Sequence, residues 1–167
     1  MLCMYILSVL LFISYVISII IINKSIPIHL SESFFILKHK YIFSAVMILL
    51  CFLTVMPLIE VLPMNLAFIA FLMCGSIAFI GVTPNYSDSF EGKIHKISAI
   101  IAIVLSQLLI ALTEPIILSS WLLLSLIFYL CCKVFGKKAS DLKLLFWVEI
   151  LAFVNTYILI LIRMVGI

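Results

Sequence analysis

The stretch YIFSAVMILLCFLTVMPLIEVL, residues 41–62, decides the fold of this chain. Its only charged side chain is Glu60, close to the end of the run. A run of about 20 apolar residues is long enough to cross the hydrocarbon core of a bilayer as a helix. A helix also satisfies its own backbone hydrogen bonds, which lipid cannot do for it. The stretch therefore predicts a membrane-spanning α-helix.

The rest of the chain has the same composition. Of its 167 residues, 67% are hydrophobic and 10% are charged, whereas soluble domains carry about 25% charged residues. No apolar run alternates as a barrel strand does, so the sequence predicts one all-α transmembrane domain over residues 1–167. Its six expected spans cover about residues 2–22, 41–62, 64–82, 94–113, 115–135 and 142–162.

The connections between these spans are of two kinds. The short segments EVLPMN (60–65) and LTEPI (112–116) each contain a proline that suits the first turn of the following helix. They predict two helical hairpins. The connections on the opposite side are longer. In the first of these, we expect Ser31 to cap a helical lead-in that starts near Glu32 and continues into the span at 41–62.

The basic residues are distributed unevenly. All nine lysines lie in or beside the three longer connections: Lys24, Lys38, Lys40, Lys93, Lys96, Lys133, Lys137, Lys138 and Lys143. The other side of the bundle holds only Arg163. Because Lys and Arg in short loops stay cytoplasmic, both termini are expected to be extracytoplasmic. We expect a multi-pass protein of the bacterial inner membrane.

The lysines also bear on partners. Orientation and contact with anionic lipid headgroups account for them, so the expected partners are membrane lipids and not nucleic acid. A bundle of this size is either a monomer or one protomer of a homo-oligomer, and the sequence leaves both open. The identity of any small-molecule ligand is also open.

Two neighbouring spans carry small or polar residues along one face. Helices in lipid associate through such residues, because they let the backbones approach closely. We therefore expect these faces to lie in the interior of the bundle. The residues are Ala67, Ala70, Cys74, Ala78 and Gly81 in one span, and His95, Ala99, Ala102 and Ser106 in the next.

A few ionisable and amide groups lie within or at the ends of spans. A charge at mid-helix costs on the order of 3 kcal/mol, so Glu149, well inside the last span, stands out. It is either a carboxylate that binds a proton or a cation, or a protonated or hydrogen-bonded carboxyl that fixes helix packing. Gln107 is expected to form a hydrogen bond between helices. Arg163 has two candidate ion-pair partners at the outer face, Glu60 and Glu114.

The segment GVTPNYSDSFEGKIHKISA, residues 81–99, is the most polar part of the chain. Asp88, Glu91 and His95 are spaced three and four residues apart, which places them on one face at the start of a helix. The helix dipole and the free N–H groups favour the two acids there without any ligand. His95 is not explained in this way. A His beside carboxylates can bind a metal or carry protons.

Ser31 and Glu32 fall at the same end of the bundle as this segment. With Asp88, Glu91 and His95, they predict a polar cavity that faces the cytoplasm. The sequence indicates no cofactor and no metal site, and it leaves any catalytic residue unknown. If a metal bound, His95 and Asp88 would be the candidate ligands.

Three stretches resemble a family of small bacterial polytopic membrane proteins of unassigned activity. They are PIHLSESFFILKHKYIF (27–43), MPLIEV (56–61) and GVTPNYSDSFEGKIHKISAI (81–100), which together cover under a third of the chain. The resemblance implies a shared six-helix fold and no particular activity.

A looser similarity is to the superfamily of alkaline ceramidases and progestin–adipoQ receptors. These membrane hydrolases place a Ser, an Asp and several His around zinc. The similarity implies that Ser31 or Ser33, Asp88 and His95 stand for parts of that site. The chain departs from the pattern, because it has only three His and six expected spans where that group usually has seven.

Three classes of function follow from these residues. The first is a membrane protein that binds or moves a small solute or a proton through the polar cavity. The second is a structural or interaction protein whose polar residues only orient helices. The third is a metal-dependent lipid hydrolase. The chain has no P-loop, G-x-G-x-x-G, G-x-S-x-G or H-E-x-x-H motif, which favours the first two classes over an enzyme.

The orientation is testable with a reporter that fluoresces only in the cytoplasm. Fused after Ile167, the reporter is expected to stay dark, because the C-terminus should be extracytoplasmic. Fused after Phe135, at the end of the fifth span, it is expected to fluoresce. Whole-cell fluorescence normalised to protein amount is the measurement, and the reverse pattern would overturn the orientation.

Overall fold

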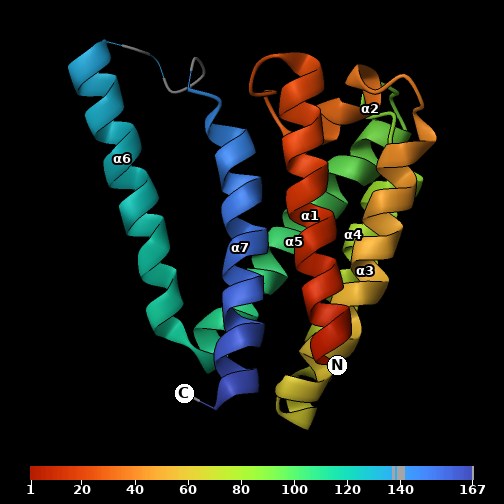
Figure 1. Ribbon diagram of the computed structural model, residues 1–167, viewed down its shortest axis with the longest axis vertical. Helices are drawn as coiled ribbons and strands as arrows, with labels where there is room; N and C mark the ends of the chain where they lie inside the picture. The colour runs from red at the N-terminus through yellow and green to blue at the C-terminus, as the bar shows by residue number, and fades with distance from the viewer. Residues whose placement is uncertain (137, 139–141, 167) are drawn as a thin grey trace.

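The computed structural model describes residues 1–136, 138 and 142–166 (Figure 1). All regular elements in this part of the chain are helical, and six helices are long and apolar enough to cross a membrane. They are α1 (Leu2–Asn23), α3 (Tyr41–Val61), α4 (Ala67–Val82), α5 (Glu91–Thr113), α6 (Ser119–Phe135) and α7 (Leu144–Val165). The expected all-α class and the six spans are confirmed, and the ends of the spans agree with those of the helices within about four residues.

The six helices run up and down, so that connections alternate between two ends of the bundle. Both termini lie at one end, and the three longer connections lie at the other (Figure 1). The two tight turns contain the short 3₁₀ helices η2 (Met64–Leu66) and η3 (Pro115–Leu118). The lysines therefore gather at one end, which we call the lysine end. Lys137 falls outside the described residues.

The centre of the bundle is a layer of three helices, in which α4 packs along both α3 and α5. Ala70, Cys74 and Gly81 are buried on α4. A Cβ atom added to Gly81 would lie 3.0 Å from Cβ of Met47 and 3.1 Å from the backbone oxygen of Ser44. The backbones of α3 and α4 are thus close enough to require a small residue, as expected for helices in lipid.

The facing side of α5 follows the same rule. His95, Ala102 and Ser106 are buried, whereas Ile100 and Val104 on the opposite side are exposed. The sequence-based assignment of the interior faces of both helices is therefore confirmed at these positions. α1 packs on α3, and α7 packs on α5.

α6 stands apart from the other helices over most of its length (Figure 1). Polar contacts at its first turn join it to the bundle. Ser120 donates a hydrogen bond to Oδ1 of Asn155 (3.0 Å), and Nε1 of Trp121 donates to Oε1 of Gln107 (2.7 Å). Gln107 thus forms the helix–helix hydrogen bond expected of it. Nδ2 of Asn155 also donates to the same Gln107 oxygen (3.3 Å).

The connection between α1 and α3 differs from the expectation. The short helix α2 (Ser33–Ile36) ends before Leu37, whose φ of −76° and ψ of 135° are extended, and α3 begins anew at Tyr41. Ser31 lies inside the 3₁₀ turn η1 (Leu30–Glu32) and caps no helix. The predicted continuous lead-in is therefore wrong. The Ser31 hydroxyl binds His95 instead (2.7 Å), so a tertiary contact replaces the cap.

The start of α5 offers a test of packing. A Cβ atom at Gly92 would lie 2.3 Å from the backbone oxygen of Tyr86, so Gly92→Ala must displace the 83–90 loop. We expect a loss of about 1–3 kcal/mol of stability, measured as a lower midpoint of thermal unfolding in detergent. The matched control is Gly75→Ala, where nothing lies within 4 Å of the new Cβ. It should be neutral or stabilising by up to about 1 kcal/mol. Equal midpoints for the two variants would contradict the close approach.

Candidate functional site

The segment that enters the bundle at the lysine end is residues 27–37, called here the mouth segment. It contains η1 and α2, and it buries Leu30, Ser31, Ser33 and Leu37 among the helices. The backbone groups at the ends of these short helices must find hydrogen-bond partners in the protein, because lipid offers none. The backbone of the mouth segment finds such partners on α7, and its side chains form hydrogen bonds to α5 and α1.

Its first attachment is to α7. The backbone N–H of Leu30 donates to Oε2 of Glu149 (2.5 Å), in the second turn of that helix. The backbone N–H of Phe146, in the first turn, donates to the carbonyl of Ile28 (3.0 Å). The first N–H groups of any helix lack partners within the helix. The mouth segment and the start of α7 therefore satisfy each other's backbone groups.

Its second attachment is to α5 through His95, whose side chain is 3% exposed. Nδ1 of His95 lies 2.7 Å from the carbonyl oxygen of Thr83, and Nε2 lies 2.7 Å from Oγ of Ser31. A carbonyl oxygen only accepts, so Nδ1 carries the proton, and in the neutral ring Nε2 accepts from the Ser31 hydroxyl. A third attachment, to α1, joins the Ser33 and Tyr15 hydroxyls at 2.6 Å.

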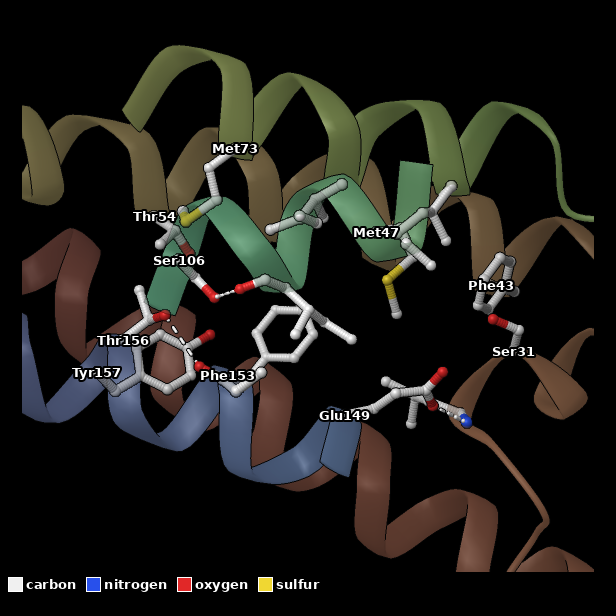
Figure 2. Close-up of a pocket in the computed structure, with 17 residues that line it drawn as sticks. Ser31, Phe43, Met47, Thr54, Met73, Ser106, Glu149, Phe153, Thr156 and Tyr157 are labelled. Atoms are coloured by element: carbon white, nitrogen blue, oxygen red, sulfur yellow. Dashed lines mark hydrogen bonds between the residues drawn. The ribbon is translucent and has the colours of Figure 1, made fainter. Parts of the chain in front are cut away.

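Beneath the mouth segment lies a cavity between α3, α4, α5 and α7 (Figure 2). Its volume is about 60 Å³, whereas about 10–15 Å³ suffices for one water molecule. Most of its lining is apolar. The polar residues of the lining are Ser31, Thr54, Ser106, Glu149, Thr156 and Tyr157.

Glu149 presents one carboxylate oxygen to this cavity. Its Oε2 accepts the hydrogen bond from Leu30, and the other oxygen points toward the space beside Met47 (Figure 2). Within the described residues this second oxygen has no hydrogen-bond partner. Figure 2 places Thr156 and Tyr157 at the opposite end of the cavity from Glu149.

The wall between α5 and α7 is not fully closed. Ala99 and Ile103 on α5 line the cavity and keep partial exposure, as do Glu149 and Phe153 on α7. Small-molecule sites in proteins are mostly apolar clefts with a few placed polar groups. This cavity has that character, with a single carboxylate near its mouth.

The acids at the start of α5 are not part of the cavity. Asp88 is exposed, and its Oδ1 accepts from the backbone N–H groups of Phe90 (2.8 Å) and Glu91 (3.0 Å). These bonds, that of Glu91 first, hold the pKa of Asp88 below its usual value. Glu91 lies partly exposed in the first turn. Glu32 accepts from the N–H of Ile28 (2.6 Å) within the mouth segment.

The predicted cavity lined by His95, Asp88, Glu91, Ser31 and Glu32 is therefore wrong in most of its members. Only Ser31 of this group lines the cavity, together with Glu149. The carboxylates of Asp88 and Glu32 bind free N–H groups close to them in the chain. Helix starts and turns have backbone N–H groups without partners in the helix, so neighbouring carboxylates bind these groups rather than a more distant site.

The candidate metal ligands do not form a metal site either. Both ring nitrogens of His95 are engaged by Thr83 and Ser31, and Asp88 faces its own backbone. Among the described residues, no group of three His, Cys, Asp or Glu side chains is placed to hold an ion. A catalytic zinc needs three protein ligands, and the residues present do not fit that requirement.

At the other end of the bundle, Nε of Arg163 lies 3.0 Å from Glu114, and its Nη2 donates to the carbonyl of Thr113 (2.9 Å). This joins the end of α7 to the end of α5. In the part of the chain that the structure describes, Glu60 forms no ion pair, so one of the two expected partners is present.

Several cavity residues were not singled out from the sequence. Thr54 and Tyr157 are single hydroxyls in apolar runs, and both bind the buried Ser8 of α1, at 2.9 and 3.0 Å. Their only sequence signal is a hydroxyl inside a span, which is common in membrane helices.

The comparisons with family models, curated proteins and solved structures found no match for this chain. Function is therefore argued from the geometry.

His29 completes the mouth segment. Its ring lies edge-on to Tyr86, with centroids 4.7 Å apart, and burial lowers its pKa, against a smaller opposing effect of Glu32. The neutral ring is thus the form of His29 that suits this packing.

The attachment to α5 can be tested with Ser31→Ala. This change leaves Nε2 of His95 buried without a partner, at a cost of about 1–3 kcal/mol. We expect amide hydrogen exchange across residues 29–37 to accelerate about tenfold, since 1.4 kcal/mol corresponds to a factor of ten. The control is Ser87→Ala, an exposed serine at the same end. Unchanged exchange in Ser31→Ala would show that the mouth segment does not depend on His95.

Proposed function

We propose that this integral membrane protein binds a small solute or a proton in the cavity beneath the mouth segment and controls its passage there. One observation carries the proposal. The Glu149 carboxylate lines the cavity with one oxygen and holds the mouth segment with the other. Occupation of the cavity and closure of the mouth therefore involve the same group.

The coupling follows from the hydrogen bond itself. Bonds to an ionised acceptor are about twice as strong as neutral ones, so the charge on Glu149 strengthens its hold on Leu30. A proton on Glu149, or a cationic ligand beside it, neutralises this charge and weakens the hydrogen bond to Leu30. Either event then favours release of the mouth segment and access to the cavity.

The sidedness is part of the proposal. With the lysine end in the cytoplasm, the mouth opens inward and both termini lie outside, in a bacterial inner membrane. The clustering of the three longer connections at one end (Figure 1) supports this arrangement. Anionic headgroups around the mouth would then contact the lysines.

A structural role is the second candidate. It is favoured by one observation: within the described residues, every fully buried polar side-chain atom has a hydrogen-bond partner. On that view Glu149 and His95 only fix the mouth segment, and the cavity is never entered. The lipid hydrolase is not carried forward, because His95 and Asp88 are each engaged elsewhere.

The two candidates are separated by chemical access to the cavity. Thr156→Cys places a thiol at the end of the cavity far from Glu149, in a chain whose natural cysteines are replaced. Membrane vesicles of both orientations are treated with the impermeant trimethylammonium-ethyl methanethiosulfonate. We expect slow labelling from the lysine side in the parent and labelling about tenfold or more faster with Glu149→Ala, which removes a charged bond of about 1.5–3 kcal/mol.

Two further variants control this experiment. Glu149→Gln keeps an acceptor for Leu30 without the charge and should fall between the parent and Glu149→Ala. Glu91→Ala removes a carboxylate at the same end that does not touch the mouth segment, and it should label like the parent. If no variant labels from either side, the cavity is not entered and the structural candidate holds.

A further inference from the structure

We infer that the cavity takes a small organic cation with N–H donors, an alkylammonium, with its nitrogen beside the free oxygen of Glu149. The inference rests on the proposed function, whose ligand it names by chemical class. It is carried by the charge of the lining, the kind of apolar groups around it, and its size.

The first step is charge. Among the described residues, Glu149 is the only acid that lines the cavity, and no Lys, Arg or His does. The ion pair found in the described residues is that of Arg163 and Glu114, at the opposite end. The Glu149 carboxylate accepts one hydrogen bond, from the backbone N–H of Leu30, and its other oxygen faces an apolar space. An ionised carboxylate in such surroundings needs either a proton or a charged partner, and a cationic ligand supplies the partner.

Five lysines of this end do not supply it. Lys38, Lys40, Lys93 and Lys96 are exposed, and Lys143 precedes the first turn of α7 without reaching Glu149 within ion-pair distance. The remaining basic group of this region, His95, does not line the cavity, and its Nε2 accepts a hydrogen bond from the Ser31 hydroxyl. The lysines thus mark the mouth, whereas the interior remains acidic.

The second step is the apolar lining. Phe43, Phe153 and Tyr157 present rings to the cavity, and Met47 and Met73 present thioethers. The face of an aromatic ring carries partial negative charge and attracts a cation within about 6 Å of its centre. An anion would meet both these rings and the carboxylate, so it is disfavoured twice.

The third step is size. The volume of the cavity is about 60 Å³, whereas an apolar cavity of about 150 Å³ holds benzene. The resting cavity therefore suits a ligand of a few heavy atoms, such as methylammonium or ethylammonium. Ser31 donates to His95 and keeps lone pairs of its own, so it offers a second acceptor near Glu149 for an ammonium N–H.

The test compares three probes of similar size on the purified full chain in detergent. They are the cation ethylammonium, its neutral counterpart ethanol, and the anion acetate. At pH 7 and constant ionic strength, the amine is protonated, as a Lys side chain is at about pH 10 and below. Thermal unfolding is followed by Trp fluorescence, because a ligand of the folded state raises the midpoint.

We expect ethylammonium to raise the midpoint in a saturable way, with half-saturation at least tenfold below that of ethanol, and acetate to have no effect. In Glu149→Gln, which keeps the size of the side chain, the preference for the cation should vanish. Glu91→Gln should retain it. Equal effects of ethylammonium and ethanol on the parent protein, or a larger effect of acetate, would overturn the inference without recourse to any variant.

Failure of this inference and failure of the proposed function give different results. If the thiol of Thr156→Cys is labelled but no cation preference is found, the cavity is entered by another class of ligand and only the inference is wrong. If the thiol is never labelled and ethylammonium has no effect, both are wrong.

Discussion

The hydrogen bond from the backbone of Leu30 to the carboxylate of Glu149 is the contact on which the rest of this structure depends. It joins groups 119 residues apart in the chain. Each would be costly alone, because lipid can solvate neither a free peptide N–H nor a carboxylate. Their pairing lets the mouth segment enter the bundle, and that segment in turn lines the cavity at the lysine end.

The bundle around this contact has a tightly packed part and a looser one. α3, α4 and α5 approach closely through small residues such as Gly81. α7 is attached to the mouth segment by hydrogen bonds, and α6 is joined to the bundle mainly at its first turn. The cavity lies where the packed layer meets α7, so its wall on one side depends on polar contacts. Polar contacts respond to charge, which close packing of apolar groups does not.

The outcomes at Asp88, Glu149 and His95 show how much of the site could be predicted from the position and spacing of residues in the sequence. Asp88 serves the start of α5, as its position in the sequence indicates, because the free N–H groups it binds are its immediate neighbours. Glu149 was identified by its depth in an apolar run, but its two alternative roles could not be separated, and in the structure it both binds a backbone group and lines a cavity. The polar cavity assigned to His95 was wrong, because Thr83 and Ser31 take both ring nitrogens.

The sequence by itself determined the membrane helices, their ends and their interior faces. Those features follow from the transfer of side chains and backbone to lipid, which depends only on local composition and on helical spacing. Only the tertiary structure decided that residues 27–37 form short separate helical turns that enter the bundle without continuing into α3, and that Glu149 receives them. That choice rests on one donor and one acceptor from distant parts of the chain, and no local pattern records such a pairing.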